Sequence, residues 1–316
     1  MINLNVKIEK QVYSVPEDSS IAKVTEMNHI TKIQTCAVKN AGPPCQKVDK
    51  DHYVDLRSGE LFVYNHSETR AEYAEGIART LENIRNLINC NVSEPDACRW
   101  VTLTYAENMQ DTKRLYEDFH SFWTRFKRWC ASKGFLIPEY ISVIEPQGRG
   151  AWHVHAFFIW SGKAPFIENK ELRRLWSQGF VSVKAVKDCD NIGAYFSAYL
   201  ADMPLSDLEK LPDQERAELQ KLPISEKTDS DGLPKKIVKG ARLHFYPSGM
   251  NIVRRSRGIK DPVVSWTTYG EAKKKASSGK LTFSDSYAIR LEDSTKILNT
   301  YSADLCQMFT LTLFNA

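Results

Sequence analysis

The segment 139–160 alternates between apolar runs and a turn, and the rest of the chain is organised around it. Apolar residues dominate Tyr140–Ile144 and Val154–Ile159, two runs of strand length. Between them lies Pro146–Gly150, whose glycines and proline are typical of a tight connection. Two apolar runs joined by such a turn predict an antiparallel β-hairpin.

Polar residues interrupt one side of this hairpin. Side chains two residues apart in a strand point to the same face, so His153 and His155 share a face of the second strand. Glu145 ends the first strand, directly across the turn. A His-x-His pair can be incidental, but an imidazole without a partner is costly in so apolar a strand. Two imidazoles and a carboxylate form three sides of a divalent metal site with open positions, and Gln147 is a weaker candidate ligand.

Helical periodicity occurs on both sides of the hairpin. Residues 68–90 carry apolar positions at helical spacing, which predicts an amphipathic helix. Asp111 suits the N-cap of a second helix that runs to about Lys133, and Gly134 suits its end. A short helix is predicted at 168–178. The apolar stripe of the second helix consists of Leu115, Phe119, Phe122, Phe126 and Cys130.

Alternating and β-branched residues predict strands elsewhere in the chain. Trp100–Tyr105 and Phe180–Val186 show this pattern, and Asp51–Tyr64 suits a short hairpin. The tail 281–316 also alternates as strands do.

The segment 188–202 predicts a helix that presents two tyrosines. Its apolar stripe repeats every four residues: Ile192, Phe196 and Leu200. Tyr195 and Tyr199 are also four residues apart, so they share a neighbouring face. Tyrosines in such positions often pack on a core with the hydroxyl at the surface. Beside a metal site, a phenol can instead act as a covalent nucleophile.

The chain divides into four parts by its charge and punctuation. Residues 1–95 form an N-terminal region with the first helix, and residues 96–203 contain the hairpin and the tyrosine segment. Residues 204–234 are charged and rich in proline, which predicts an insertion or linker. Residues 235–316 are basic and strand-rich, and we expect them to complete the core and to bind DNA.

Positive charge is clustered rather than abundant. The net charge of the 316 residues is only +4, but basic residues gather on the helix 111–133 and after residue 235, where aromatic residues interleave them. Single-stranded DNA suits such a surface because its bases stack on aromatic rings and its phosphates attract cations. The candidate DNA contacts are Arg125, Arg128, Arg149, Lys235, Lys236, Arg242, Arg254, Arg255, Arg257 and Lys260.

The cysteines and the apolar runs indicate the compartment. Seven cysteines at scattered positions argue against a disulfide framework and for a reducing cytoplasm. No apolar run approaches the length of a membrane span, and the first residues, MINLNVKIEKQ, lack a signal-peptide pattern. We therefore expect a cytoplasmic protein with no membrane partner.

Metal ligands, a pair of phenols and clustered cations together favour phosphodiester chemistry. A metal can bind a phosphate oxygen and offset the charge that gathers on phosphorus. A free tyrosine, with a pKa near ~10, is almost wholly protonated at neutral pH and needs activation. Attack by tyrosine keeps the cut DNA end on the protein, so the bond can be remade. A hydrolase that used water would not need the tyrosines.

In this combination and order, the residues resemble the HUH endonucleases, specifically the rolling-circle replication initiators of bacterial plasmids and related mobile elements. Val101–Tyr105 resembles their first motif, and His153-Val-His155 is similar to their paired-histidine motif. Ala194–Tyr199 resembles their helical tyrosine motif. The resemblance covers about residues 98–203 and some of 235–270.

The resemblance implies a fold, a site and an activity. The fold is α+β, a central antiparallel sheet with flanking helices and a ferredoxin-like or RRM-like core. Tyr195 and Tyr199 are the implied catalytic residues, and His153, His155 and Glu145 the implied ligands of Mg²⁺ or Mn²⁺. The activity is site-specific nicking of single-stranded origin DNA, which leaves a 5′-phosphotyrosine link and a free 3′-OH to start rolling-circle replication. A host helicase and polymerase are implied partners, because the chain has no G-x-x-x-x-G-K-[ST] phosphate loop.

Departures from the family pattern leave some questions open. The family usually has a lysine three residues after the tyrosine, where this chain has Ala198 and Asp202, so the activating cation must come from elsewhere. Asp202 would also repel a phosphate near Tyr199, which favours Tyr195 slightly as the nucleophile.

Other functions remain as alternatives. One is an HUH relaxase or transposase of a mobile element, but here the tyrosines follow the histidines, which favours an initiator over a relaxase. The other is a non-catalytic nucleic-acid-binding module with a structural metal, although structural zinc sites usually have four protein ligands.

Overall fold

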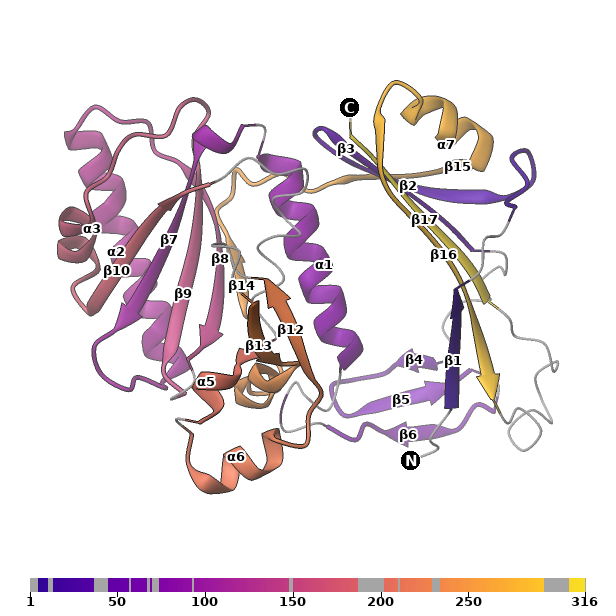
Figure 1. Cartoon of the computed structure of the whole chain (residues 1–316), viewed down its shortest axis with the longest axis horizontal. Helices are drawn as coiled ribbons and strands as arrows, with labels where there is room; N and C mark the ends of the chain where they lie inside the picture. Colours follow the sequence, from indigo (N-terminus) through magenta and orange to yellow (C-terminus); the bar gives the residue numbers. More distant parts are fainter. Residues whose placement is uncertain are drawn as a thin grey trace. The chain divides into compact units, whose positions relative to one another are not determined.

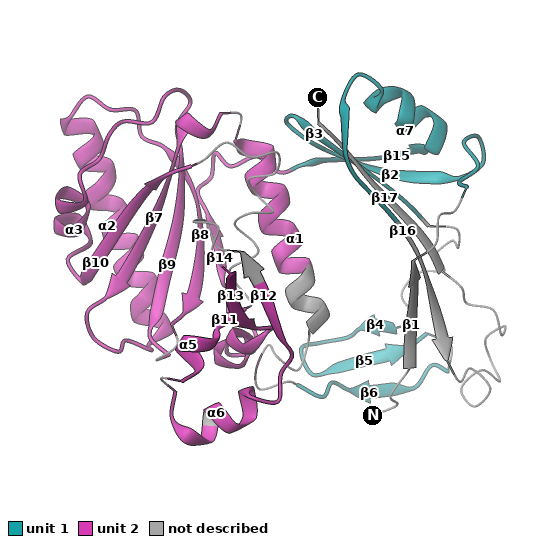
Figure 2. Cartoon of the chain, in the orientation of Figure 1, with its two compact units in different colours: residues 1–66, 262–316 teal, residues 67–261 magenta. Residues whose placement is uncertain are grey.

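The chain folds into two units, described in a computed structural model (Figure 2). One unit comprises residues 67–261, and the other combines 1–66 with 262–316. The residues that the structure describes are 5–10, 14–36, 45–56, 58–66, 69, 74–92, 94–147, 150–186, 202–209, 211–228, 234–292 and 307–315. These boundaries differ from the four parts expected from charge, because residues before 262 pair with the central hairpin and later ones pair with the N-terminal strands.

The predicted hairpin forms the centre of the unit 67–261. Strand β8 (Glu139–Pro146) pairs with β9 (Trp152–Ile159), and Glu145 lies opposite His153 in the register. Gly150 in the connection has a positive φ of 82°, a conformation that glycine adopts without strain. The hairpin and its register are therefore those that the alternation of side chains predicts.

The hairpin belongs to a five-stranded antiparallel sheet with the order β10-β7-β9-β8-β14 (Figure 1). Strands β7 (Cys98–Tyr105) and β10 (Gly179–Ala185) contain the runs that sequence alternation marked as strands. Strand β14 (Val253–Arg255) is the edge beside β8. A short piece of the basic C-terminal part thus completes the central sheet.

Helix α2 (Thr112–Ser132) covers one face of this sheet. The side chain of Asp111 caps it by accepting hydrogen bonds from two backbone amides, and Gly134, with a φ of 71°, follows its end. Its apolar stripe packs on β9, where Phe126 stacks on Phe158 with ring centres 4.8 Å apart. Helix α3 (Asn169–Trp176) packs into the same core.

Helix α1 (Ala74–Asn91) covers part of the other face. Its buried residues Ile84 and Leu87 share a core with Ile141 of β8 and Phe157 of β9. Because Phe157 lies two residues after His155, the histidines and α1 are on the same side of the sheet.

The charged segment after residue 202 is folded in its described parts. Strands β11 (Met203–Pro204), β13 (Pro234–Val238) and β12 (Ile224–Thr228) form a small sheet, joined by α5 (Leu205–Leu208) and α6 (Asp213–Leu219). A core of their own holds these elements together: Met203, Leu208, Leu211, Leu219, Val238 and Ala241. Leucines spaced among charged residues explain why a segment expected to be an insertion or linker is structured.

The second unit contains a six-stranded sheet with the order β1-β16-β17-β3-β2-β15. Its strands are β1 (Asn5–Lys10), β2 (Ile21–Met27), β3 (Ile30–Cys36), β15 (Val263–Thr268), β16 (Lys280–Glu292) and β17 (Gln307–Asn315). Helix α7 (Tyr269–Ala276) packs on β2 and β3. A separate small sheet consists of β4 (Cys45–Lys47), β5 (His52–Asp55) and β6 (Leu61–Val63).

The architecture is α+β with antiparallel sheets, as the sequence predicts. Of the helices in the described ranges, none has the length and apolarity required to cross a membrane.

Candidate functional site

The three predicted metal ligands meet at one end of the β8–β9 hairpin. Nε2 of His155 lies 2.5 Å from Oε2 of Glu145, and both side chains are largely buried, 18% and 7% exposed. The ring centre of His153 is 6.1 Å from that of His155. The alternation of the strands, which the sequence makes visible, is what gathers these side chains.

Residues of the neighbouring strand β7 orient the ring of His155. Thr102 lies directly opposite His155, and its Oγ1 is 3.1 Å from Nδ1 of the ring. The indole nitrogen of Trp100 lies 3.2 Å from both atoms. An indole N–H only donates, whereas a hydroxyl donates or accepts. Thr102 can therefore serve either tautomer of His155, with the proton on Nε2 towards Glu145 or on Nδ1 towards Oγ1.

Burial also fixes the charge of His155. Removal from water lowers the pKa of this imidazole to about 4, so the ring is neutral at neutral pH. A neutral imidazole is the form that binds a metal.

An arginine that sequence reasoning placed on DNA reaches into this site. Arg242 lies in the short helix η3 (Ala241–Phe245), and its guanidinium contacts Oε1 of Glu145. The side chain is only 12% exposed, and burial lowers its pKa to about 10, which leaves it charged at neutral pH. Its predicted contact with DNA stays a prediction, and in this structure its partner is Glu145.

A buried hydrogen bond holds η3 against the end of β8. Tyr246, which ends η3, is almost fully buried, and its hydroxyl donates to the carbonyl of Ile144 at 2.9 Å. Ile144 directly precedes Glu145 in the chain. Tyr246 therefore sets the distance between η3 and the carboxylate. Local patterns in the sequence contain no signal for this contact, because the two residues are far apart in the chain.

The donor set fits a divalent metal if Arg242 leaves Glu145. Two imidazoles and a carboxylate are suitable ligands for such an ion, and His155 is held neutral. As described, however, one oxygen of Glu145 contacts Arg242 and the other accepts a hydrogen bond, and no cluster of three or more potential metal ligands is formed within the described ranges. Gln147 lies in the connection of the hairpin. The site can hold a metal only after the carboxylate changes partner.

Tyr195, Tyr199 and Arg149 lie outside the described residues. The described end of the tyrosine segment is Asp202, whose Oδ1 accepts a hydrogen bond from the backbone N–H of Gly240 at 3.1 Å. Gly240 directly precedes η3. Three residues of extended chain span at most ~11 Å, so Tyr199 begins within that distance of Asp202.

The other predicted DNA contacts do not form a single patch. Arg254 and Arg255 are neighbours on β14 and point to opposite faces of the sheet. Arg254 stacks on Tyr116 of α2, with 3.6 Å from its guanidinium carbon to the ring centre, whereas Arg255 pairs with Asp261 at 2.5 and 2.9 Å. Four others also lie apart: Arg125 and Arg128 on α2, and Lys235 and Lys236 on β13. Arg257 and Lys260 follow β14 in the chain.

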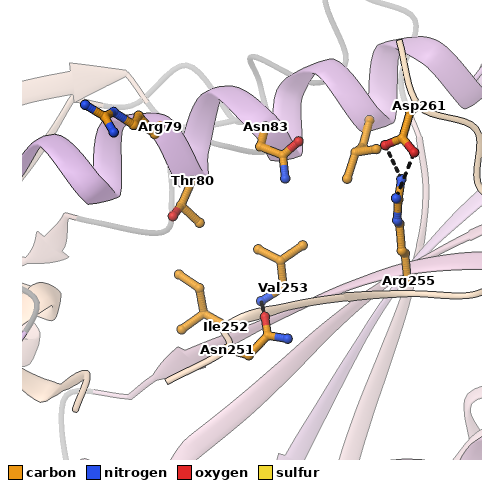
Figure 3. Close-up of a pocket in the computed structure, with 9 residues that line it drawn as sticks. Arg79, Thr80, Asn83, Asn251, Ile252, Val253, Arg255 and Asp261 are labelled. Carbon is orange, nitrogen blue, oxygen red and sulfur yellow. Dashed lines mark hydrogen bonds and ion pairs between the residues drawn. The ribbon is translucent and has the colours of Figure 1, made fainter. Parts of the chain in front are cut away.

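A cavity of about 360 Å³ lies between α1 and β14. Figure 3 shows Thr80 and Asn83 projecting from α1 towards Ile252 and Val253, with the Arg255–Asp261 pair beside them. Val253 pairs with Val143, which pairs with His155, so the cavity opens on the same face as the site. Sequence reasoning did not find this cavity, because helix and strand are distant in the chain.

One comparison with known proteins gives a match. Residues 98–204 match the family model of the replication-associated protein ORF2, about a third of the 316 residues. The matched stretch runs from β7 to β11 and includes Glu145, His153 and His155. No curated protein and no solved structure matches the chain. The stretch that carries the Glu145–His155 pair is therefore similar to replication-associated proteins of the ORF2 family.

Proposed function

We propose that this protein nicks and rejoins single-stranded DNA at an origin and so starts rolling-circle replication. The observation that carries the proposal is the contact of Glu145 with His155, inside a stretch that matches replication-associated proteins. A buried carboxylate and a neutral imidazole, oriented by a neighbouring strand, are what a metal-assisted phosphodiester transfer needs.

The reaction is a transfer of the phosphodiester bond to tyrosine. The phenol oxygen of Tyr195 or Tyr199 attacks the phosphorus, and a bond forms between them. The bond from phosphorus to O3′ breaks, and O3′ gains a proton as the phenol loses one. The products are a 5′-phosphotyrosine and a free 3′-OH. Because one phosphodiester replaces another, the step is reversible and the strand can be rejoined.

His153, His155 and Glu145 would hold the metal, Mg²⁺ or Mn²⁺. A bound divalent cation supplies Lewis-acid charge that offsets the negative charge gathering on the phosphate. Thr102 holds the ring of His155 in orientation, and burial keeps that ring neutral. Burial of Glu145 excludes water from the carboxylate and strengthens its interactions with cations.

Basic residues on the histidine face of the sheet would bind the DNA strand. Arg255 lines the cavity beside β14, on the face that carries His155. A polar cavity next to the site suits a nucleotide that flanks the cut. A host helicase and polymerase would open and copy the duplex.

The test uses single-stranded oligonucleotides that tile the element encoding the protein. With Mn²⁺, we expect one oligonucleotide to be cut at one position and to leave a covalent protein–DNA adduct. Glu145→Gln and the pair His153→Ala with His155→Ala should lose both products. Specific binding without any cut or adduct would contradict the proposal and favour a non-catalytic module with a structural metal.

A further inference from the structure

We propose that Arg242 has two partners in turn: Glu145 when the site holds no metal, and the phosphate to be cut when metal and DNA are bound. This inference rests on the proposed function. It assigns to η3 a catalytic cation that the tyrosine segment lacks.

The first partner follows from the burial of both charges. Glu145 is 7% exposed and Arg242 is 12% exposed, so each needs an opposite charge. The hydrogen bond from Tyr246 to Ile144 holds η3 in place and keeps the guanidinium beside the carboxylate. Arg242 therefore keeps the metal-free site neutral and preformed.

The guanidinium retains capacity for a second partner. Nε of Arg242 is buried and has no hydrogen-bond partner among the residues that the structure describes. A buried N–H without an acceptor costs free energy, on the order of 1–3 kcal/mol. A phosphate presents several acceptor oxygens, and the planar fork of arginine matches them. A phosphodiester bound beside Glu145 would satisfy the fork that Glu145 satisfies only in part.

Metal and arginine compete for the same carboxylate. Oε1 of Glu145 contacts Arg242, and Oε2 accepts from His155. A cation on this carboxylate removes its need for a counterion and frees the guanidinium. The freed side chain stays on η3, beside the site, where a phosphate would lie.

The chain offers no other cation at this point in the tyrosine segment. The residues three positions after Tyr195 and Tyr199 are Ala198 and Asp202. Asp202 is tied to Gly240, which directly precedes η3, so the described end of this segment meets the helix that carries Arg242. The cation is thus supplied by a different element of the fold.

The experiment measures two quantities on the full-length protein: the affinity for Mn²⁺ by calorimetry and the rate of nicking. In Arg242→Gln, loss of the competing cation should tighten Mn²⁺ binding by about tenfold. The same substitution should slow nicking by about 100-fold or more, because a charge-stabilising donor is lost. Arg174→Gln removes the same charge from the exposed end of α3 and should change neither quantity.

The opposite signs of the two effects separate this role from a structural one. If Arg242 only stabilised the fold, its loss would weaken metal binding and nicking together. Mn²⁺ binding in Arg242→Gln that is unchanged or weaker, in a protein that melts cooperatively, would overturn the inference. If Arg242→Gln does not fold, Arg242→Lys replaces it, with both effects expected in the same directions and smaller, and unchanged values would overturn the inference.

The wild-type protein distinguishes this failure from failure of the proposed function. Wild-type protein that neither binds Mn²⁺ nor forms an adduct would refute the nicking activity itself. Wild-type protein that does both, with an Arg242→Gln variant that behaves identically, would refute only the role of Arg242.

Discussion

Nε2 of His155 lies 2.5 Å from Oε2 of Glu145, across the β8–β9 hairpin. This contact joins the two ends of the sequence argument, since the histidine comes from one apolar run and the carboxylate ends the other. It also defines the resting state of the site, because the second oxygen of Glu145 faces Arg242. Metal binding must therefore be an exchange of partners at Glu145.

Removal of the Thr102 hydroxyl should weaken metal binding without unfolding the protein. Thr102→Val keeps the shape of the side chain but leaves Nδ1 of His155 without its hydroxyl partner. Loss of such an outer contact typically costs 10- to 100-fold in metal affinity, and we expect a loss of about that size for Mn²⁺ by calorimetry. Thr124→Val removes an exposed hydroxyl of α2 as a control. Equal Mn²⁺ affinities in the two variants would show that Thr102 does not orient the ligand.

Burial of His155 predicts a loss of stability in mild acid. The pKa of the folded state is about 4, below the ordinary value of 6.5. Between these values the unfolded chain binds a proton that the folded chain does not, so the free energy of unfolding falls as pH drops from 6.5 to 4. The contribution is up to about 3 kcal/mol.

The measurement is urea unfolding at several pH values in this window. His155→Gln should show a shallower fall of the unfolding free energy than wild type. His120→Gln, an exposed position on α2, should keep the wild-type slope. A wild-type slope in His155→Gln would mean that another group controls acid stability.

The hydroxyl of Tyr246 should matter for both stability and activity. Tyr246→Phe removes a buried hydrogen bond to Ile144 and should lower the unfolding free energy by about 1 kcal/mol, with slower nicking because η3 shifts. Tyr116→Phe removes a hydroxyl that donates to Asn251 at an exposed position, and its cost should be a few tenths of a kcal/mol. Urea unfolding compares the two, and equal costs would argue against a clamp at Tyr246.

The sequence predicts what its local patterns encode. A period of two in the strands placed Glu145, His153 and His155 on one face, and the N-cap at Asp111 and the glycine at Gly134 marked the ends of α2. These features depend on residues close together in the chain.

Contacts between distant segments were not predictable in this way. The partner of Arg242 is Glu145, but a count of basic residues assigned Arg242 to DNA with its neighbours. The small core after residue 202 was hidden because charged residues outnumber its leucines. The six-stranded sheet escaped prediction because strands from both ends of the chain pair with each other.

Opposite orientations on β14 allow a test of which face binds DNA. Arg255 lies on the face of His155, and Arg254 lies on the face of α2. We expect Arg255→Gln to weaken binding of single-stranded DNA and to reduce the salt slope of log affinity by about 0.7, the value for one phosphate contact. Arg254→Gln should have the smaller effect. Fluorescence anisotropy over a range of salt measures both, and the reverse order would place the strand on the α2 face.

The covalent adduct tests the central claim most directly. The protein is incubated with Mn²⁺ and the oligonucleotide that it cuts, and the modified residue is mapped by mass spectrometry in wild type, Tyr195→Phe, Tyr199→Phe and the double variant. We predict a 5′-phosphotyrosine at Tyr195 in wild type and no adduct in the double variant. An adduct only at Tyr199 would reverse the order of the two tyrosines. A cut that leaves no adduct, or an adduct that persists in the double variant, would contradict the account.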